Sequence, residues 1–162
     1  MAQSHGTTDD ILNLACAKLG LNQFKDEQKR ALDSFLKGHD VFISLPTGFG
    51  KSVVFQAAPI CCDIGKAGED DDHSFALVVM PIKALIKDQL DRCTRLHIGA
   101  KDISGGYDDS FLESLFSGQV SLLFTSPEFL TGESGRAFLR LQYVQDHLCG
   151  LFIDESHCVL KW

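Results

Sequence analysis

Residues 45–52 read Leu45-Pro46-Thr47-Gly48-Phe49-Gly50-Lys51-Ser52, and this stretch decides the fold. An apolar run at 40–45 precedes it and predicts a strand, and the pattern at 52–64 predicts a helix after it. Glycines let successive backbone N–H groups turn around an anion, and the N-terminus of the following helix adds a partial positive charge. Strand, glycine-rich loop, Lys-Ser and helix in this order predict a loop that binds the phosphates of a nucleotide.

Within this loop, the residue types assign the roles. Lys51 is expected to reach the β- and γ-phosphates, and the Ser52 hydroxyl to ligate Mg²⁺. The general pattern has a glycine where this chain has Leu45, and the Pro-Thr-Gly form seen here is typical of superfamily 2 helicases. A glycine-rich turn with an incidental lysine is the structural alternative. The expected nucleotide contacts are Thr47, Gly48, Phe49, Gly50, Lys51 and Ser52.

A second motif lies about a hundred residues further on, where the apolar run 151–153 leads into Asp154 and Glu155. The run predicts a buried strand, and two charges at its end are costly unless they have a partner or a function. Asp154 is expected to hold the hydration shell of Mg²⁺, and Glu155 to orient and deprotonate an attacking water. With the phosphate loop, this pair predicts hydrolysis of a nucleoside triphosphate.

Gln28 points to adenine as the base. Phe24, Ala31, Leu32 and Phe35 form one helical stripe over residues 24–37, and Gln28 falls on the same stripe. A glutamine on an apolar face needs a hydrogen-bond partner, and its amide can pair with N6 and N7 of adenine. A bond from Gln28 to the backbone, or partial exposure, is the alternative explanation.

Five stretches resemble, in order, motifs of the RecQ family of DNA helicases. Residues 24–28 resemble its Phe-x-x-x-Gln motif, which contacts adenine, and residues 78–89 and 124–128 resemble motifs that touch the nucleic-acid strand. Residues 154–157 match its Asp-Glu-x-His box, with Ser156 in place of the usual alanine, and residues 157–162 look like the start of its aromatic-rich loop. The resemblance spans residues 19–162.

The resemblance implies an ATP-dependent DNA helicase that uses ATP and Mg²⁺ and unwinds DNA in the 3′-to-5′ direction, in recombination and repair. Its partners would be single-stranded and duplex DNA. It adds Phe24 to the adenine contacts and His157 to the catalytic residues Lys51, Asp154 and Glu155, with Ser52 and Asp154 as metal ligands, partly through water. The implied nucleic-acid contacts are Pro81, Lys83, Lys87, Gln89, Thr125, Ser126 and Trp162.

Composition suits an intracellular globular domain, and the resemblance implies a nuclear location in a eukaryote and otherwise a cytoplasmic one. Six cysteines show no Cys-x-x-Cys pairing, and we interpret them as reduced apolar residues. No apolar run approaches the roughly 18 residues needed to span a bilayer, and the N-terminus is not signal-like, so no membrane partner is expected. The net charge of −7 has the wrong sign for a stand-alone nucleic-acid binder, but much of the excess lies at 69–72, interpreted as a solvated loop.

The predicted elements alternate along the chain. Strands are expected at 41–45, 75–80, 100–103, 120–125 and 150–154, and helices at about 7–20, 24–37, 52–64, 82–96 and 108–116, with helical stretches from Glu128 and Arg136. This alternation predicts an α/β fold with a mostly parallel sheet covered by helices on both faces. The phosphate loop, Pro81, residues 125–127 and Asp154 then follow strand C-termini, where such folds place ligands. This matches a RecA-like P-loop NTPase lobe.

The expected organisation is an N-terminal helical segment at 1–20 and a first RecA-like lobe at 21–162, truncated at its end. Helicases of this group use two such lobes, and we expect the second lobe and its arginine finger to be missing after Trp162. Two alternatives stay open: an RNA-directed helicase of the same superfamily, since phosphate contacts do not distinguish DNA from RNA, and a truncated module that binds ATP or nucleic acid without unwinding.

Overall fold

The computed structural model describes residues 7–66 and 73–155. The predicted sites His157 and Trp162 and the acidic run at 69–72 therefore lie outside the described residues. The chain divides into two compact units, Met1–Asp70 and Asp71–Trp162, and each is described by itself. The proposed boundary at residue 20 stays a prediction.

Three helices build the first unit: α1 (Thr8–Lys18), α2 (Asp26–Leu36) and α3 (Ser52–Gly65). Thr7 caps α1 by a capping box, because its hydroxyl accepts from the Asp10 N–H and the Asp10 carboxylate accepts from the Thr7 N–H. The helices share a core to which α1 contributes Leu12 and Ala15, and α2 contributes Leu32. Residues 53–59 of α3 are buried all round, as expected of a helix surrounded by protein.

The predicted strand at 41–45 is wrong. Residues 39–46 have no regular secondary structure, and Phe42 is 81% exposed. An apolar run has a tendency to form a strand, but a strand exists only where a neighbour exchanges hydrogen bonds with it. No such pairing to this segment is present among the described residues. The glycine-rich loop therefore follows an irregular segment in this structure.

The second unit is built on a four-stranded sheet of β1 (Phe75–Val79), β2 (Ala100–Asp102), β3 (Leu122–Thr125) and β4 (Leu148–Ile153). The strand order is β2-β3-β1-β4, and all three pairings are parallel. This parallel sheet with intervening helices confirms the predicted fold class. Four of the five predicted strands are present, with ends shifted by at most two residues.

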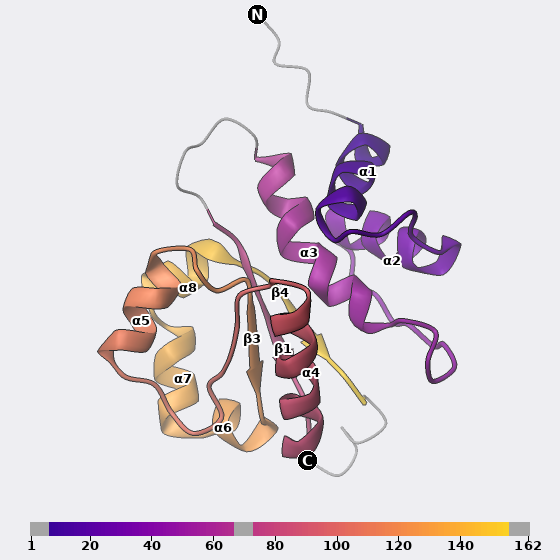
Figure 1. Ribbon diagram of the computed structural model, residues 1–162. Helices are drawn as coiled ribbons and strands as arrows, with labels where there is room; N and C mark the ends of the chain where they lie inside the picture. The colour runs from indigo at the N-terminus through magenta and orange to yellow at the C-terminus, as the bar shows by residue number, and fades with distance from the viewer. Residues whose placement is uncertain (1–6, 67–72, 156–162) are drawn as a thin grey trace, which may run out of the picture. The chain divides into compact units, whose positions relative to one another are not determined.

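The strands are connected by α4 (Lys83–Arg95), α5 (Asp109–Phe116), α6 (Pro127–Thr131), α7 (Glu133–Leu139) and α8 (Gln142–His147). The α4 connection runs from β1 past β3 to the β2 edge, and the α5 connection runs back towards β1. Right-handed crossovers in opposite directions place their helices on opposite faces of a sheet. Figure 1 accordingly shows α4 apart from α5, α7 and α8, which lie together.

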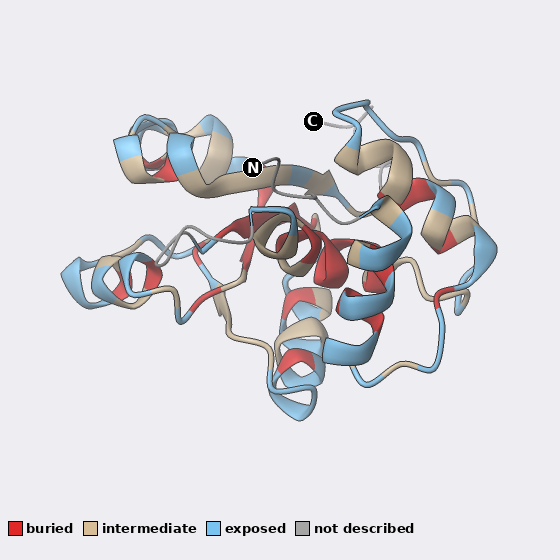
Figure 2. Ribbon diagram, turned by 90° about the horizontal axis from the view of Figure 1, so that it is seen from above, coloured by how far each residue is buried: buried red, intermediate tan, exposed pale blue. Residues whose placement is uncertain are grey.

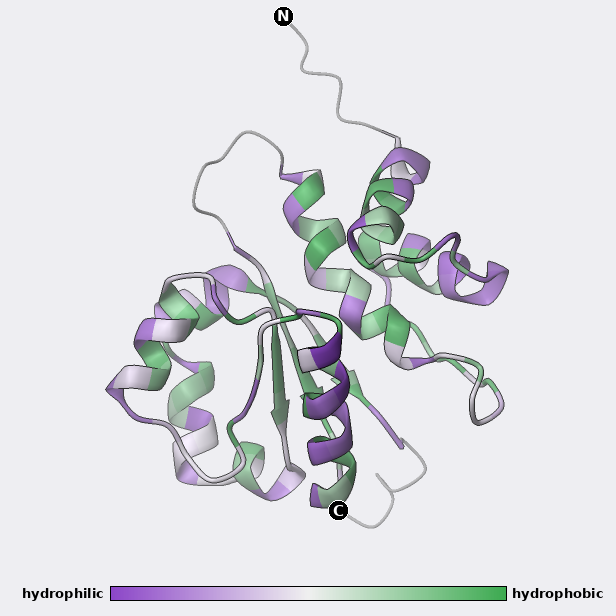
Figure 3. Cartoon of the chain, viewed as in Figure 1, coloured by the Kyte–Doolittle hydropathy of each residue, from purple (hydrophilic) through white to green (hydrophobic). Residues whose placement is uncertain are grey.

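The larger core lies between the sheet and the group α5, α7 and α8. Phe75, Leu77 and Leu123 from alternate strand positions meet Phe111 and Phe138 from the helices. The remaining residues of β1 and β3, which point to the other face of the sheet, are buried as well, so both faces of these strands are covered. Figure 2 shows the buried residues on the strands and the inner sides of the helices, and Figure 3 shows hydrophilic residues over much of α4.

Strand β4 forms one edge of the described sheet and carries an irregularity. Phe75 pairs with Leu148, but the next residue, Ala76, pairs with Gly150, so Cys149 is an extra residue in β4. The strand pairs with β1 along one side, and its side chains are incompletely covered, with Leu151 56% and Ile153 44% exposed. The prediction that residues 151–153 form a strand is confirmed, but the prediction that this strand is buried is wrong.

Among the described cysteines, Cys16, Cys61 and Cys93 are buried thiols. Burial raises the pKa of Cys61 to about 12 and the pKa of Cys93 to about 11. Both thiols therefore stay protonated at neutral pH and pack as small apolar groups. Across residues 7–66 and 73–155, no helix combines the length and apolarity needed to cross a membrane.

The contact between Gly99 and the segment before β3 gives a test of this packing. A Cβ atom at Gly99 would overlap the carbonyl oxygen of Gln119, and the Gly99 carbonyl accepts from the N–H groups of Ser121 and Leu122. We expect Gly99→Ala to lower the free energy of unfolding by about 1–3 kcal/mol, the usual effect of overpacking. Gly105→Ala is the control, because no atom lies within 4 Å of its added Cβ. Urea unfolding that gives equal midpoints for the two variants would contradict this packing.

Candidate nucleotide and nucleic-acid sites

The glycine-rich loop forms a tight turn before α3. The Phe49 N–H donates to the Pro46 carbonyl at 3.2 Å, which closes a turn over Thr47 and Gly48. Gly48 has φ 81° and Gly50 has φ 87°, a conformation that side chains with a Cβ rarely adopt. These two positive φ values explain why glycine occupies both positions.

The loop fits the phosphate groups of a nucleotide. Gly50 has a positive φ and Lys51 a right-handed helical conformation, and this alternation turns successive N–H groups towards one side. Within residues 7–66, the N–H groups of Gly50, Lys51 and Ser52 donate to no protein acceptor. Helix α3 begins at Ser52 and brings the positive end of its dipole to the same place. Such unpaired donors at a helix N-terminus bind anions.

Gln28 is 4% exposed, as its place on the apolar stripe predicts. Its Oε1 accepts from the Lys25 N–H at 2.9 Å, and its Nε2 donates to the Gly50 carbonyl at 2.9 Å. The amide therefore bonds to the backbone, which is the alternative weighed for it above. The amide keeps one further lone pair and one further hydrogen that could pair with a base. Because the group is buried, it would first have to become exposed to make that contact. Its role towards adenine, and that of the neighbouring Phe24, stay predictions.

Lys25 contacts the glycine-rich loop, and the sequence did not predict this contact. Its Nζ donates to the Phe49 carbonyl at 2.9 Å and lies 4.2 Å from the centroid of the Phe49 ring. In the sequence, Lys25 is one of several charged residues flanking an apolar stripe, and nothing distinguishes it from Lys29 or Arg30. Only the fold brings it to a loop 24 residues away.

In the second unit, the predicted site residues gather at the carboxyl edge of the sheet. The Met80 N–H donates to the Thr125 carbonyl at 2.9 Å, and the Asp154 N–H donates to the Val79 carbonyl at 3.0 Å. These bonds fix the ends of β3, β1 and β4 side by side. Pro81, Ser126 and Asp154 each follow one of these ends, at the position where parallel sheets bind ligands.

The acidic pair sits in a turn directly after β4. The Glu155 N–H donates to Oδ1 of Asp154 at 3.0 Å, and both residues are half-buried. Glu155 has φ 55°, a left-handed conformation that is uncommon for a residue with a side chain. Residues in such conformations cluster at functional sites, where surrounding structure holds them. Lys51 and Ser52 belong to the first unit and this pair to the second.

The predicted nucleic-acid contacts differ in exposure. Lys83 and Lys87 are exposed one turn apart on α4, while Ile86 and Cys93 of this helix are buried. Gln89 is half-buried, and within the described residues its Oε1 has no hydrogen-bond partner. Thr125 and Ser126 are buried, and the Ser126 hydroxyl caps α6 by accepting from the Phe129 N–H at 3.3 Å. The exposed lysines are therefore more accessible to a nucleic-acid strand than the hydroxyls of Thr125 and Ser126 are.

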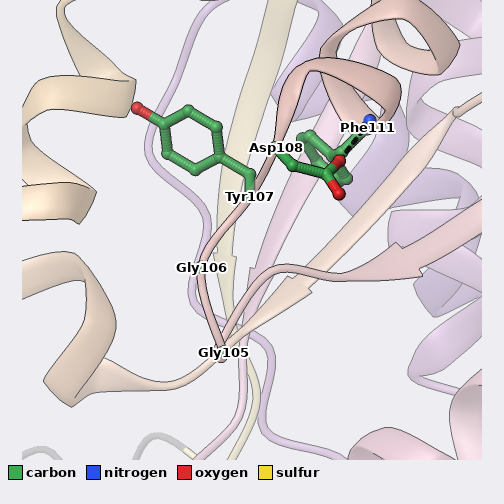
Figure 4. A pocket seen from close by; sticks show the side chains of 5 residues that line it. All are labelled: Gly105, Gly106, Tyr107, Asp108 and Phe111. Carbon is green, nitrogen blue, oxygen red and sulfur yellow. Dashed lines mark hydrogen bonds between the residues drawn. The ribbon is translucent and has the colours of Figure 1, made fainter.

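A hollow of about 330 Å³ adjoins this edge after β2. Gly105, Gly106, Tyr107, Asp108 and Phe111 line it (Figure 4). Asp108 caps α5 by accepting from the Phe111 N–H at 2.8 Å, and this bond, followed by one from the Ser110 hydroxyl, lowers the pKa of the Asp108 carboxyl. The carboxylate is therefore ionised at neutral pH, and its Oδ1 already accepts a hydrogen bond from the first turn of α5. Sequence analysis had not singled out this loop.

The parallel sheet and the glycine-rich loop define the class of RecA-like lobes. A family model described as "DEAD/DEAH box helicase" matches residues 25–162. The chain belongs to the DEAD/DEAH box helicase family.

The curated proteins similar to this chain include RecQ-like helicases. The chain is 33% identical over 156 residues to "RecQ-like DNA helicase blm-1" of Caenorhabditis elegans, with 90% of the chain covered, and 30% identical over 161 residues to "RecQ-like DNA helicase BLM" of Xenopus laevis, with 94% covered. It is 28% identical over 155 residues to "ATP-dependent DNA helicase RecQ" of Haemophilus influenzae, with 93% covered. The matches cover 14%, 11% and 23% of these relatives, respectively. The resemblance to the RecQ family is confirmed.

The two glycines of the loop give a matched test of its geometry. Both have a positive φ, but a Cβ at Gly50 would lie 2.8 Å from Nε2 of Gln28, whereas a Cβ at Gly48 meets nothing within 4 Å. Each substitution by alanine carries the roughly 1–2 kcal/mol cost of a left-handed residue. We expect Gly50→Ala to be less stable than Gly48→Ala in urea unfolding, because it also breaks the bond from Gln28. Adding Gln28→Ala should reduce that difference; an unchanged difference would show that the contact is absent.

Proposed function

We propose that the chain is the ATP-binding lobe of a RecQ-like, ATP-dependent DNA helicase that unwinds DNA in the 3′-to-5′ direction. ATP is the substrate and Mg²⁺ the metal. The observation that carries the proposal is the loop before α3, which combines two left-handed glycines, unpaired N–H groups and Lys51 at one helix N-terminus. The names of the similar proteins support the choice of DNA.

Each residue then has a stated task. The loop N–H groups and Lys51 bind the phosphates, and Ser52 and Asp154 hold Mg²⁺, partly through water. The metal supplies neutralisation of charge on the phosphate oxygens. Glu155 accepts a proton from the attacking water and orients it. The hydrogen bond from the Glu155 N–H to Oδ1 of Asp154 supports these separate tasks for the two residues, because it limits the rotation of the Asp154 carboxylate.

Nucleic acid is proposed to run along the carboxyl edge of the sheet. Lys83 and Lys87 supply exposed positive charge for the phosphate backbone, next to Pro81 at the end of β1. Contacts to phosphates position a strand without reading its sequence, so this surface would act on any base order. The roles of His157 and Trp162 in coupling this contact to hydrolysis, a nuclear or cytoplasmic location, and a part in recombination and repair belong to the same proposal.

The first test removes Lys51. We expect Lys51→Ala to weaken binding of Mg²⁺-ATP to the 162-residue chain by about tenfold or more, the scale of one charge-assisted hydrogen bond. The wild-type affinity should itself be weak, since a second lobe would form the other wall of the site. Lys18→Ala is the control, because Lys18 is an exposed lysine at the end of α1. Equal affinities of wild type and Lys51→Ala by calorimetry would reject the phosphate-loop assignment.

The second test separates binding from chemistry in a longer protein that contains both lobes. Glu155→Gln should leave ATP binding nearly unchanged and lower turnover by at least about a hundredfold, the low end for loss of a general base. Asp154→Asn should also weaken binding that depends on Mg²⁺. ATPase rates with and without single-stranded DNA or RNA measure both effects and the preferred strand. Turnover of Glu155→Gln near the wild-type rate would leave the proposal without a mechanism.

A further inference from the structure

Helices α5 and α8 carry an aromatic row of three rings, those of Phe116, Tyr143 and His147, near their C-terminal ends. The centroids of the Phe116 and Tyr143 rings lie 4.6 Å apart, and the Tyr143 ring stacks on the His147 imidazole at 3.9 Å with an interplanar angle of 11°. Phe116 is 46% exposed and is the only exposed phenylalanine or tyrosine among residues 73–155. Figure 1 shows the two helices next to each other. The row therefore ends in an aromatic side chain that is open to solvent.

Hydrogen bonds hold the rings of the aromatic row in place. The Tyr143 hydroxyl donates to the Leu115 carbonyl at 3.0 Å, which joins α8 to α5. Nδ1 of His147 lies 2.9 Å from the Tyr143 carbonyl, and because a carbonyl only accepts, this nitrogen carries the hydrogen. Side chains that are already ordered lose little conformational entropy when a partner binds them. The aromatic row is therefore preorganised for contact with a partner.

The charged groups beside the aromatic row are carboxylates. Glu113 lies one turn before Phe116 on α5, Asp146 lies one turn after Tyr143 on α8, and both carboxylates are exposed. Neither helix contains lysine or arginine, and neither carboxylate forms a salt bridge among residues 73–155. The last turn of α5 adds the negative end of the helix dipole at Phe116. The surface thus combines an exposed ring with negative charge that no cation pairs with.

Arginine has the chemistry that complements this surface. Its guanidinium group stacks on an aromatic face and pairs with a carboxylate through two parallel hydrogen bonds, whereas the ammonium group of lysine is a strongly hydrated point charge. Phe116 offers the aromatic face, and Glu113 offers the carboxylate three residues earlier on the same helix. Nucleic acid is disfavoured here, because the same carboxylates repel its phosphates.

The aromatic row lies at the opposite end of the sheet from the acidic pair. Helix α5 ends at Phe116 before β3, and α8 ends at His147 directly before β4, so both helix ends adjoin the amino ends of parallel strands. Asp154 and Glu155 follow the carboxyl end of β4, which is six residues long. At about 3.3 Å per residue, this strand spans roughly 20 Å. A partner bound to the row therefore leaves the carboxyl edge accessible.

We propose that the aromatic row, with Glu113 and Asp146 beside it, is a docking surface for an arginine-containing peptide segment of a partner protein. The central contact is a guanidinium group that lies on the exposed face of Phe116 and pairs with Glu113. The surface belongs to the second unit alone, and it uses none of the residues proposed to bind ATP or nucleic acid. Its occupation is therefore independent of the proposed function.

The test uses a blocked peptide of three arginines separated by glycines. The peptide is titrated into the 162-residue chain while the amide chemical shifts are recorded, and we expect saturable changes concentrated at residues 113–117 and 143–147. Phe116→Leu should weaken binding about two- to fivefold, the scale of one exposed cation–π contact, and Phe116→Tyr should retain it. Glu113→Gln should weaken binding about two- to threefold, the scale of one exposed ion pair.

Two controls separate this contact from general attraction to a chain with a net charge of −7. Asp91→Asn removes an exposed carboxylate from α4 and should weaken binding less than Glu113→Gln does. A peptide with three lysines in place of the arginines carries the same charge and should bind more weakly. Urea unfolding shows whether the variants are folded, and Glu113→Gln tests the surface even where Phe116→Leu lowers the stability.

Each contrary outcome rejects the proposal. Shift changes that do not saturate, or that are concentrated outside residues 113–117 and 143–147, place the peptide elsewhere. Equal affinities for the arginine and lysine peptides, or equal losses in Glu113→Gln and Asp91→Asn, assign the effect to net charge. Changes at residues 113–117 that depend on the concentration of the chain alone identify a second copy as the occupant. The same changes on addition of oligothymidylate alone identify nucleic acid.

Discussion

Strand β1 is hydrogen bonded along both of its edges, to β3 and to β4, and the arrangement of the second unit depends on this double pairing. Parallel pairing requires that all strands point the same way, so their carboxyl ends meet at one edge. The bonds that Met80 and Asp154 make at this edge bring together segments from positions 80, 125 and 154 of the chain. The core residues of β1 therefore also support these three segments, and a change in their packing would reach Asp154 and Glu155 through the backbone.

The glycine-rich loop is stabilised in a different way. No strand partner is present for residues 40–45 among the described residues, and the loop is instead held by side chains from the start of α2. The side chains of Lys25 and Gln28 donate to successive carbonyls, and the N–H groups of Gly50, Lys51 and Ser52 donate to no acceptor within residues 7–66. A loop that must bind an anion benefits from this arrangement, because its acceptors are satisfied by protein while its donors are not.

Features that depend on contiguous residues could be predicted from the sequence. The loop at 45–52 and the pair at 154–155 each carry their residue types and neighbours within one short stretch, and the parallel sheet follows from the alternation of helices and strands. The strand at 41–45 could not be judged in this way, because pairing depends on a partner far along the chain. The same holds for the burial of residues 151–153 and of Thr125, which depends on the position of each strand in the sheet. The contacts of Lys25 and Gln28 to the loop also lie beyond local patterns, since 24 and 22 residues separate the partners.

The extra residue in β4 has a consequence for where the length of this strand can change. Side chains alternate between the faces of a strand, so one residue added to a regular strand exchanges the faces of every residue after it, whereas a bulge absorbs the added residue and restores the alternation. With Cys149 present, Leu148 and Leu151 fall on the same face as Phe75 and Leu77, and Asp154 follows on the opposite one. Deletion of Cys149 would leave the pairs Phe75–Leu148 and Ala76–Gly150 unchanged, whereas deletion of a residue between Gly150 and Ile153 would bring Glu155 to the place of Asp154. The irregularity at Cys149 thus divides β4 into two parts: a one-residue change of length at Cys149 leaves the acidic pair in place, and the same change after Gly150 moves it.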